Sequence, residues 1–359
     1  MFEHMAMWTW PDAIWGQEPA RIVDRLRAAR VDIIIPYVSR RAADGAVFGG
    51  EVQSPARYEE RLRALTAEAH RQELRVHACF DEINAYPAMP AEAYACRQVR
   101  EDGSVAESLC PANPAAAAYI LGELERVLTD FAYDGIGLED GYVYNNSTIY
   151  DPANAGTETY RLIPVCYCDY CRAHAPIGAP EWGQWKRDRM TALIAAEAAL
   201  IRRLRPGIPF STAARVPYAQ AFYAPYREEI PYYGGWGFCA ARDNLCADWA
   251  AWLRQGYLDF VCPMSYFHSS RLIELQTREC QRLIPDAAQH VWVGLGLDYI
   301  AAEYWEGADK GHAAVRNDAA ALARQLDLVE SLGQRNCVFF SHQFLLDEHI
   351  PVMAAHRGG

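Results

Sequence analysis

The sequence lacks a long apolar run and has no excess of positive charge. No stretch reaches the roughly 20 consecutive apolar residues of a membrane-spanning helix, so we expect no membrane partner. Among its 359 residues, 34 are Lys or Arg and 46 are Asp or Glu, a formal net charge of −12. A nucleic-acid partner is therefore not expected, because binding to a phosphate backbone depends on clustered positive charge. The segment Met1–Trp8 has neither the basic start nor the apolar core of a secretory signal, which predicts a cytoplasmic protein.

Several motifs are also missing. We find no phosphate-binding glycine loop, no dinucleotide-binding motif and no serine-nucleophile elbow. No low-complexity segment and no clear repeat interrupts the chain. The 11 cysteines are an odd number in a long chain, which does not indicate a disulfide scaffold. The chemistry is therefore to be sought among carboxylates, aromatic residues and clustered cysteines.

Short apolar segments alternate with segments of helical periodicity along the whole chain. This alternation predicts an α/β fold, a single (β/α)8 TIM barrel over residues 1–359 with a long loop insertion at 142–180. The final segment, Ile350–Gly359, reads as a tail. The predicted strands are Met5–Trp10, Val31–Val38, Leu74–Phe80, the start of Asp134–Tyr142, Ile208–Ala214, Leu258–Tyr266, His290–Asp298 and Asn336–Ser341.

The stretch Asp134–Tyr142 organises the candidate site. It follows an amphipathic helix whose apolar stripe runs from Ile120 to Phe131. Side chains alternate along a strand, so Ile136 and Leu138 share one face and Glu139 belongs to the other. If the apolar face meets the outer helices, Glu139 points inward at the carboxyl end of the strand, where barrel enzymes keep their chemistry.

Other strands end in carboxylates in the same way. Asp81 follows the third strand, Asp298 ends the seventh, and Asp140 stands next to Glu139. These residues are either solvated side chains at strand ends or parts of a site. Carboxylates that converge on one mouth destabilise a fold, which favours a functional interpretation. Glycoside hydrolysis requires two such groups, one on each side of the scissile bond.

Further residues near the predicted strand ends are candidates for substrate binding. Aromatic side chains stack on sugar rings, although most of them in any protein serve packing. His77 faces inward on the third strand and is expected to fill the barrel or to orient a carboxylate. The predicted substrate-binding residues are His77, Arg215, Tyr266, His268, His342 and Trp10.

The segment Cys166-x-Cys168-x-x-Cys171 predicts a metal site. Three thiolates at this spacing suit a tetrahedral structural Zn²⁺, which needs a fourth ligand. Cys110, in the loop before the helix that leads to Asp134, is the preferred fourth ligand, and His174 is the alternative. The competing interpretation is a set of reduced cysteines without metal.

Four segments resemble the glycosyl hydrolase-like barrel families over most of the chain. They are Leu74–Phe80, Leu109–Pro114, Tyr133–Asp140 and Leu258–Tyr266. The resemblance implies a barrel fold and a carbohydrate substrate. In that pattern, the carboxylate five residues after the Asp of Asp-Gly-Ile is usually Asp, whereas this chain has Glu139.

The cysteine spacing is similar to the zinc cluster of family 42 β-galactosidases. That resemblance implies an acid/base after strand four and a nucleophile after strand seven, places comparable to those of Glu139 and Asp298. The Asn-Glu pair of that family is absent here.

These observations together predict a glycoside hydrolase. Glu139 is the expected acid/base and Asp298 the expected nucleophile or base, with Asp140 and Asp81 as the alternatives. Two other classes stay open: a carbohydrate-binding barrel without turnover, and a lyase or isomerase that holds a catalytic metal with His77, Asp81 and Glu139. A homo-oligomer is compatible with either class.

Overall fold

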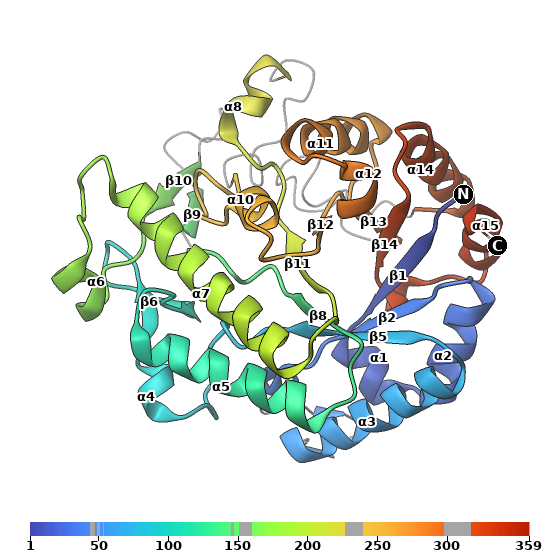
Figure 1. Cartoon of the computed structure of the whole chain (residues 1–359), viewed down its shortest axis with the longest axis horizontal. Coiled ribbons are helices and arrows are strands. Elements are labelled where there is room, and N and C mark those ends of the chain that lie inside the picture. Colours follow the sequence, from blue (N-terminus) through green and yellow to red (C-terminus); the bar gives the residue numbers. More distant parts are fainter. Residues whose placement is uncertain are drawn as a thin grey trace.

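The computed structural model describes residues 1–43, 47–48, 51–52, 54–144, 147–150, 160–226, 240–297 and 317–358. Eight parallel strands follow one another around a barrel, each beside its neighbours in the sequence of barrel strands (Figure 1). Two parallel bridges, Val261 to Val291 and Met264 to Gly294, close the barrel between β12 and β13. The strands are β1 (His4–Thr9), β2 (Ile33–Pro36), β5 (Arg75–Phe80), β8 (Gly135–Leu138), β11 (Phe210–Ala214), β12 (Phe260–Pro263), β13 (Val293–Gly296) and β14 (Asn336–Phe340).

Helices surround the barrel on the outside. Several begin with a side chain that accepts a backbone N–H of the first turn, as Ser54, Asn113 and Asp318 do at α3, α5 and α14. No helix of the described residues is long and apolar enough to cross a membrane. The main helices are α2 (Pro19–Ala28), α3 (Pro55–Arg71), α5 (Pro114–Asp130), α7 (Trp182–Leu204), α10 (Trp249–Arg254), α11 (Ser270–Leu283), α14 (Ala319–Ser331) and α15 (His349–His356); shorter ones are α1 (Pro11–Gly16), α4 (Ala91–Tyr94), α6 (Asp169–His174), α8 (Gln220–Tyr223) and α12 (Ala287–His290). The predicted (β/α)8 barrel is confirmed.

Two apolar layers lie on the two faces of the barrel sheet. On β5, Val76, Ala78 and Phe80 pack outward against the helices, whereas Cys79 belongs to the cluster inside the barrel. Ile136 and Leu138 likewise pack outward on β8. The predicted alternation is therefore confirmed, because a parallel strand with two buried faces still sends successive side chains to opposite sides.

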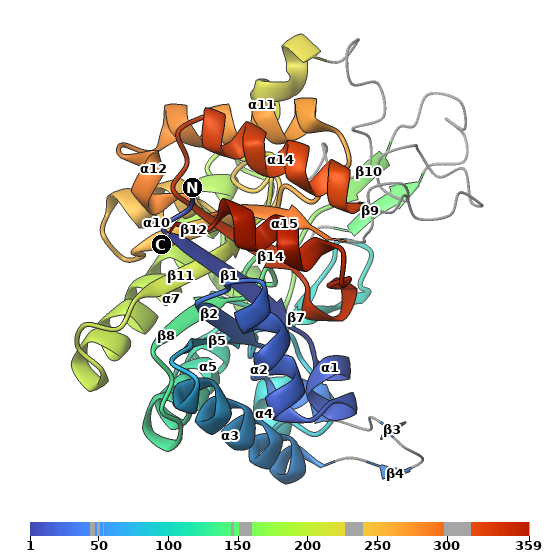
Figure 2. The same ribbon diagram turned by 90° about the vertical axis from the view of Figure 1, so that its right-hand side faces the viewer.

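Additional hairpins lie on the side of the barrel to which β1 points (Figure 2). Two of them are β3 (Val47–Phe48) with β4 (Glu51–Val52), and β9 (Ser147–Tyr150) with β10 (Tyr160–Ile163). A third, β6 (Arg97–Val99) with β7 (Val105–Leu109), precedes α5. These segments, with α6, extend the end of the barrel at which β5 and β8 finish.

The prediction that the last ten residues form a tail is wrong. Residues 349–356 form α15, in which His349 and Met353 are fully buried. The N-terminus lies beside this helix in Figure 1, and the backbone N–H of Phe2 donates to the carbonyl of His356 at 2.8 Å. The helix is short and apolar on most sides, so no helical period marks it in the sequence, and it is held by contacts with distant segments.

Candidate active site at the carboxyl end of the barrel

The ends of β5 and β8 bring three carboxylates together. Asp81 follows β5, and Glu139 and Asp140 follow β8, which is its immediate neighbour in the barrel. The negative charges of Asp140 and Asp81 both act on Glu139. The structure therefore places the three predicted residues in one group.

Asp81 is almost completely buried. Its Oδ2 accepts a 2.6 Å hydrogen bond from the Tyr37 hydroxyl, and its Oδ1 accepts one of 2.8 Å from the Asn84 amide. The Arg41 guanidinium lies 3.8 Å from Oδ2. Burial nevertheless raises the pKa of Asp81 to about 7, because these partners only partly replace the lost water.

Glycine at position 141 is required by the close packing of this loop. A Cβ at Gly141 would collide with the amide of Asn84 and lie 3.1 Å from Oδ1 of Asp81. The loop after β8 therefore lies directly on the hydrogen-bonded pair Asp81–Asn84.

Asp140 has a different environment from that of Glu139. The guanidinium of Arg215, which follows β11, lies 2.9 Å from Oδ2 of Asp140. Asp140 and Arg215 thus form a close ion pair beside Glu139.

Glu139 is half-buried, and no arginine makes an ion pair with it among the described residues. Its Oε2 accepts the backbone N–H of Asp140 at 2.7 Å. Burial raises the pKa of Glu139 well above its usual value, and the charges of Asp140 and Asp81 raise it further. The two adjacent carboxyl groups thus differ in environment, because Asp140 has a cationic partner and Glu139 has none among the described residues.

Aromatic side chains form one wall of this end of the barrel. Tyr266 stacks on Phe340 with their ring centres 5.0 Å apart. The ring centre of Trp10 lies 5.4 Å from that of Phe340 and 5.0 Å from that of Tyr37. Glu139 acts electrostatically on the Tyr266 hydroxyl, so these groups lie near one another. Trp10 and Tyr266 are half-buried, and each leaves part of its ring accessible.

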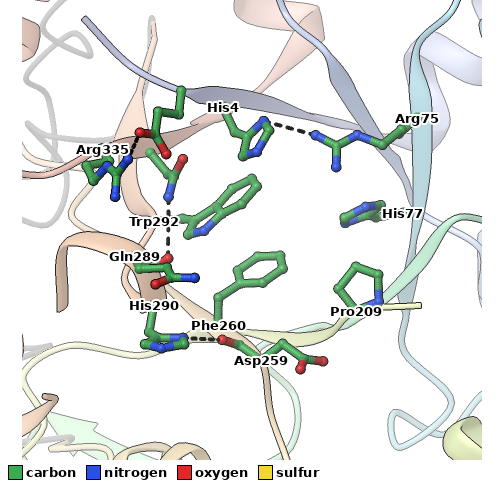
Figure 3. A pocket seen from close by; sticks show the side chains of 12 residues that line it. His4, Arg75, His77, Pro209, Asp259, Phe260, Gln289, His290, Trp292 and Arg335 are labelled. Atoms are coloured by element: carbon green, nitrogen blue, oxygen red, sulfur yellow. Dashed lines mark hydrogen bonds and ion pairs between the residues drawn. The ribbon is translucent and has the colours of Figure 1, made fainter. Parts of the chain in front are cut away.

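Among the described residues, none of the three histidines predicted to bind substrate makes a hydrogen bond or ion pair with Asp81, Glu139 or Asp140. His77 lines a pocket at the opposite, amino-terminal end of the barrel, as Figure 3 shows. His342 is buried in η4 (His342–Phe344), and the charges that act on it belong to Arg25 and Arg21 of α2. His268 is exposed just before α11. The placement of His77 also removes the predicted metal set of His77, Asp81 and Glu139.

Three residues of the site, Tyr37, Arg41 and Asn84, were not predicted from the sequence. Tyr37 continues the inward alternation of Ile33 and Ile35, which could have identified it. Arg41 lies in η1 (Arg40–Ala43), where no periodicity marks it. Asp298, the predicted nucleophile, lies outside the described residues. Gly294 and Gly296, which precede it on β13, are at the positions that face the inside of the barrel.

The four cysteines predicted to bind metal are gathered in one buried group. The sulfur atoms of Cys110, Cys166, Cys168 and Cys171 lie within 4.8 Å of one another. The sulfurs of Cys110 and Cys171 are 3.5 Å apart. His174, the alternative fourth ligand, is exposed and packs on Tyr170 at 4.4 Å. Four sulfur donors in this arrangement can hold one metal ion.

A parallel barrel whose acidic side chains meet at the carboxyl ends of the strands has the architecture of glycoside hydrolases. Comparison with known proteins gives the same class. The glycosyl hydrolase-like 10 family matches residues 50–305, and the chain belongs to this family. The resemblance inferred from the sequence is thereby confirmed.

Individual relatives are distant. The chain is 25% identical over 229 residues to the glycosyl hydrolase DigH of Escherichia coli (strain K12), covering 58% of this chain and 47% of that protein. It thus spans about half the length of that relative. Among solved structures, the PgaB (BpsB) glycoside hydrolase domain from Bordetella bronchiseptica matches 99% of this chain and 98% of that chain, with a TM-score of 0.62 and 16% identity. A β-galactosidase from Halorubrum lacusprofundi matches 98% of this chain and 57% of that chain, with a TM-score of 0.63 and 12% identity. These similarities show the barrel fold.

Proposed function

We propose that this protein hydrolyses a glycosidic bond at the carboxyl end of its barrel, with Glu139 as the general acid. The observation that carries the proposal is the contrast between Glu139 and Asp140. Glu139 is half-buried with a raised pKa, and the Asp140 carboxylate is paired with the guanidinium of Arg215 at 2.9 Å. A carboxyl group that stays protonated near neutral pH can protonate the leaving oxygen of a glycoside.

The second group required by this reaction is a carboxylate on the other side of the scissile bond. We assign Asp298 to that role, as nucleophile or as the base that activates water, with Asp140 and Asp81 as the alternatives. The negative charge of Asp140 would stabilise the positive charge that develops on the sugar ring in the transition state. Trp10 and Tyr266 would provide the aromatic surface on which the ring packs.

The role of Glu139 is tested by the dependence of the rate on the leaving group. Glu139→Gln should lower kcat/KM by about 10²–10⁴ on alkyl glycosides, which need protonation. The same variant should lose much less kcat/KM on dinitrophenyl glycosides, because their leaving group departs without a proton. Glu125→Gln, on the exposed face of α5, is the matched control. Equal losses on both substrates would argue against Glu139 as the acid, and sugar binding without product from any glycoside would favour a binding protein.

We further propose that Cys110, Cys166, Cys168 and Cys171 bind one structural Zn²⁺. In a tetrahedral zinc site with Zn–S bonds of about 2.3 Å, the sulfurs lie about 3.8 Å apart. The spacing of these four sulfurs, all within 4.8 Å, supports this coordination without a large rearrangement. The cluster joins the loop before α5 to the segment that follows β10, so the metal would stabilise the insertion after β8.

A buried lysine beside the cluster supports a negatively charged metal centre. Lys186 on α7 is 6% exposed, and its Nζ donates to the carbonyl of Val165 at 2.8 Å. Its Nζ lies 4.4 Å from the centre of the Trp182 ring and 5.5 Å from that of Tyr144. Among the described residues, no carboxylate makes an ion pair with it, and the acidic groups acting on it are the thiols of Cys246, Cys166 and Cys171. An ammonium group is costly to bury without an opposite charge, and four thiolates around one Zn²⁺ supply that charge. Metal analysis of protein purified without added zinc, with Cys110→Ser as the comparison, tests the proposal, and a metal-free wild-type protein would exclude it.

A further inference from the structure

A pocket of about 500 Å³ opens at the amino-terminal end of the barrel, opposite the carboxylates (Figure 3). Its lining residues stand at strand beginnings: His4 at β1, Arg75 at β5 and Asn336 at β14. The volume is within the range of small-molecule sites. Barrel interiors are usually filled with branched aliphatic side chains, whereas the residues at these strand beginnings are polar or aromatic.

The two arginines of the pocket already have carboxylate partners. Arg75 donates to Oδ2 of Asp32 at 2.7 Å, and Arg335 pairs with Glu3. The Asp259 carboxylate accepts the backbone N–H of Phe210 at 2.7 Å. The pocket therefore offers no unpaired arginine to a ligand.

The groups that lack partners are neutral. Nε2 of His77 and Oδ1 of Asn336 are buried and make no hydrogen bond. Asn336 donates through Nδ2 to the carbonyl of Gln289 at 3.3 Å, which leaves Oδ1 as the free acceptor. Burial lowers the pKa of His77 to about 4, so its ring is uncharged near neutral pH. His77 and Asn336 both line the pocket, and a bound molecule can supply the partners that these two atoms lack.

The opposite wall of the pocket is aromatic. Trp292 stacks between His4 and Phe260, with its ring centre 5.4 Å from that of His4 and 4.3 Å from that of Phe260. Figure 3 shows His77 facing Trp292 and Phe260 across the pocket, with Pro209 below His77 on the same side. An apolar wall facing uncharged donors and acceptors suits a molecule with a C–H face and several hydroxyl groups.

We propose that this pocket binds an uncharged polyhydroxylated molecule of monosaccharide size. A hydroxyl group can donate to Oδ1 of Asn336, and another can donate to or accept from the imidazole of His77. The C–H face of the same molecule packs against Phe260 and Trp292. The site is distinct from the one around Glu139, and the inference does not depend on hydrolase activity.

Soaking crystals of the whole protein with D-glucose, D-galactose, N-acetyl-D-glucosamine or myo-inositol tests the proposal. Electron density for one of these molecules is expected between His77 and Trp292. In solution, ligand-observed NMR titration of the same compounds should show binding that weakens about tenfold or more in Asn336→Leu and in His77→Phe. Phenylalanine keeps a ring over Gly135, which has no room for a Cβ, and removes only the nitrogens. Glu125→Gln, on the exposed face of α5 and outside both sites, is the matched control and should leave this affinity unchanged.

Several results would overturn the proposal. One is density for sugar only near Glu139, or only water in the pocket after soaking. Another is binding that Asn336→Leu and His77→Phe leave unaltered. Occupation by phosphate or ammonium ions in parallel soaks, with none of the neutral compounds bound, would assign the pocket to a charged ligand instead. The soak of the wild-type protein decides the question even if a variant does not fold.

Discussion

The hydroxyl group of Tyr142 donates a 3.0 Å hydrogen bond to Oε1 of Glu197. This bond joins α7 to the segment that carries Glu139 and Asp140, three and two residues before Tyr142. Glu197 is fully buried, and its second oxygen has no partner. Burial raises the pKa of Glu197 to about 8, so the folded protein holds this residue as a neutral carboxylic acid at neutral pH.

The pH dependence of stability should therefore change in Glu197→Gln. In the unfolded chain, Glu197 ionises near its ordinary pKa of 4.5, whereas in the folded protein it stays protonated up to about pH 8. The folded state thus binds more protons between these values, and the free energy of unfolding falls as pH rises through this window. Glutamine does not ionise, so the variant avoids this fall in the free energy of unfolding, and its side-chain oxygen can still accept the Tyr142 hydrogen bond. Urea unfolding should show no advantage for the variant near pH 4 and an advantage of a few kcal/mol near pH 8.

A pH-independent difference between Glu197→Gln and the wild type would contradict this assignment. Glu125→Gln serves as the control, because Glu125 is a half-exposed residue on α5. Its curve should follow that of the wild type at every pH.

The pH–rate profile should respond to the charges around Glu139 in opposite directions. Asp140 raises the pKa of Glu139, and Arg215 lowers it. If Glu139 is the acid, its pKa sets the alkaline limb of kcat/KM. Asp140→Asn should shift that limb to lower pH and Arg215→Met should shift it to higher pH, as measured in each variant on the same substrate. Shifts of the same sign would mean that another group controls the limb.

The strands and the position of the carboxylates could be predicted because both depend on local regularities. A period of two places Val76 and Ile136 outside and Asp81 and Glu139 inside, whatever the details of packing. Parity does not say at which end of the barrel a side chain lies. His77 is four residues before Asp81, and at about 3.3 Å per residue the two lie about 13 Å apart along β5. The predicted metal set at the mouth failed for that reason.

Other parts of the molecule depend on contacts that no local pattern encodes. Arg41 reaches Asp81 from η1 and Asn84 reaches it from a loop, and neither spacing nor polarity marks these two residues. The helix α15 is fixed by distant partners: the imidazole of His349 lies 2.7 Å from the carbonyl of Asn317. The cysteine site is the exception, since thiol groups are rare enough for spacing alone to identify the group.

Gly141→Ala should destabilise the protein by about 1–3 kcal/mol and lower activity. The added methyl group would collide with Asn84 and press on Asp81, so the loop that carries Glu139 and Asp140 must move. Gly122→Ala is the matched control, because a Cβ at Gly122 on α5 meets nothing within 4 Å. In a helix interior, alanine should raise stability by up to about 1 kcal/mol. Thermal unfolding of both variants measures the contrast, and a neutral Gly141→Ala would mean that the loop is less closely packed than the structure indicates.

Lys186→Met tests the metal centre, because the direction in which it changes the melting temperature depends on the charge of the cysteine cluster. If the four cysteines are thiolates around Zn²⁺, Lys186 balances their charge, and its loss should lower both the zinc affinity and the melting temperature. If the cysteines are neutral thiols, Lys186 is an uncompensated buried cation, and methionine should raise the melting temperature. Arg189→Met, at an exposed position three residues further along α7, controls for loss of a positive charge on the helix. We expect Lys186→Met to lower the melting temperature of the zinc-loaded protein, and to lower it less after chelation, because the interaction between Lys186 and the cluster then disappears. A variant that is more stable than the wild type before chelation would rule out a charged zinc–thiolate site.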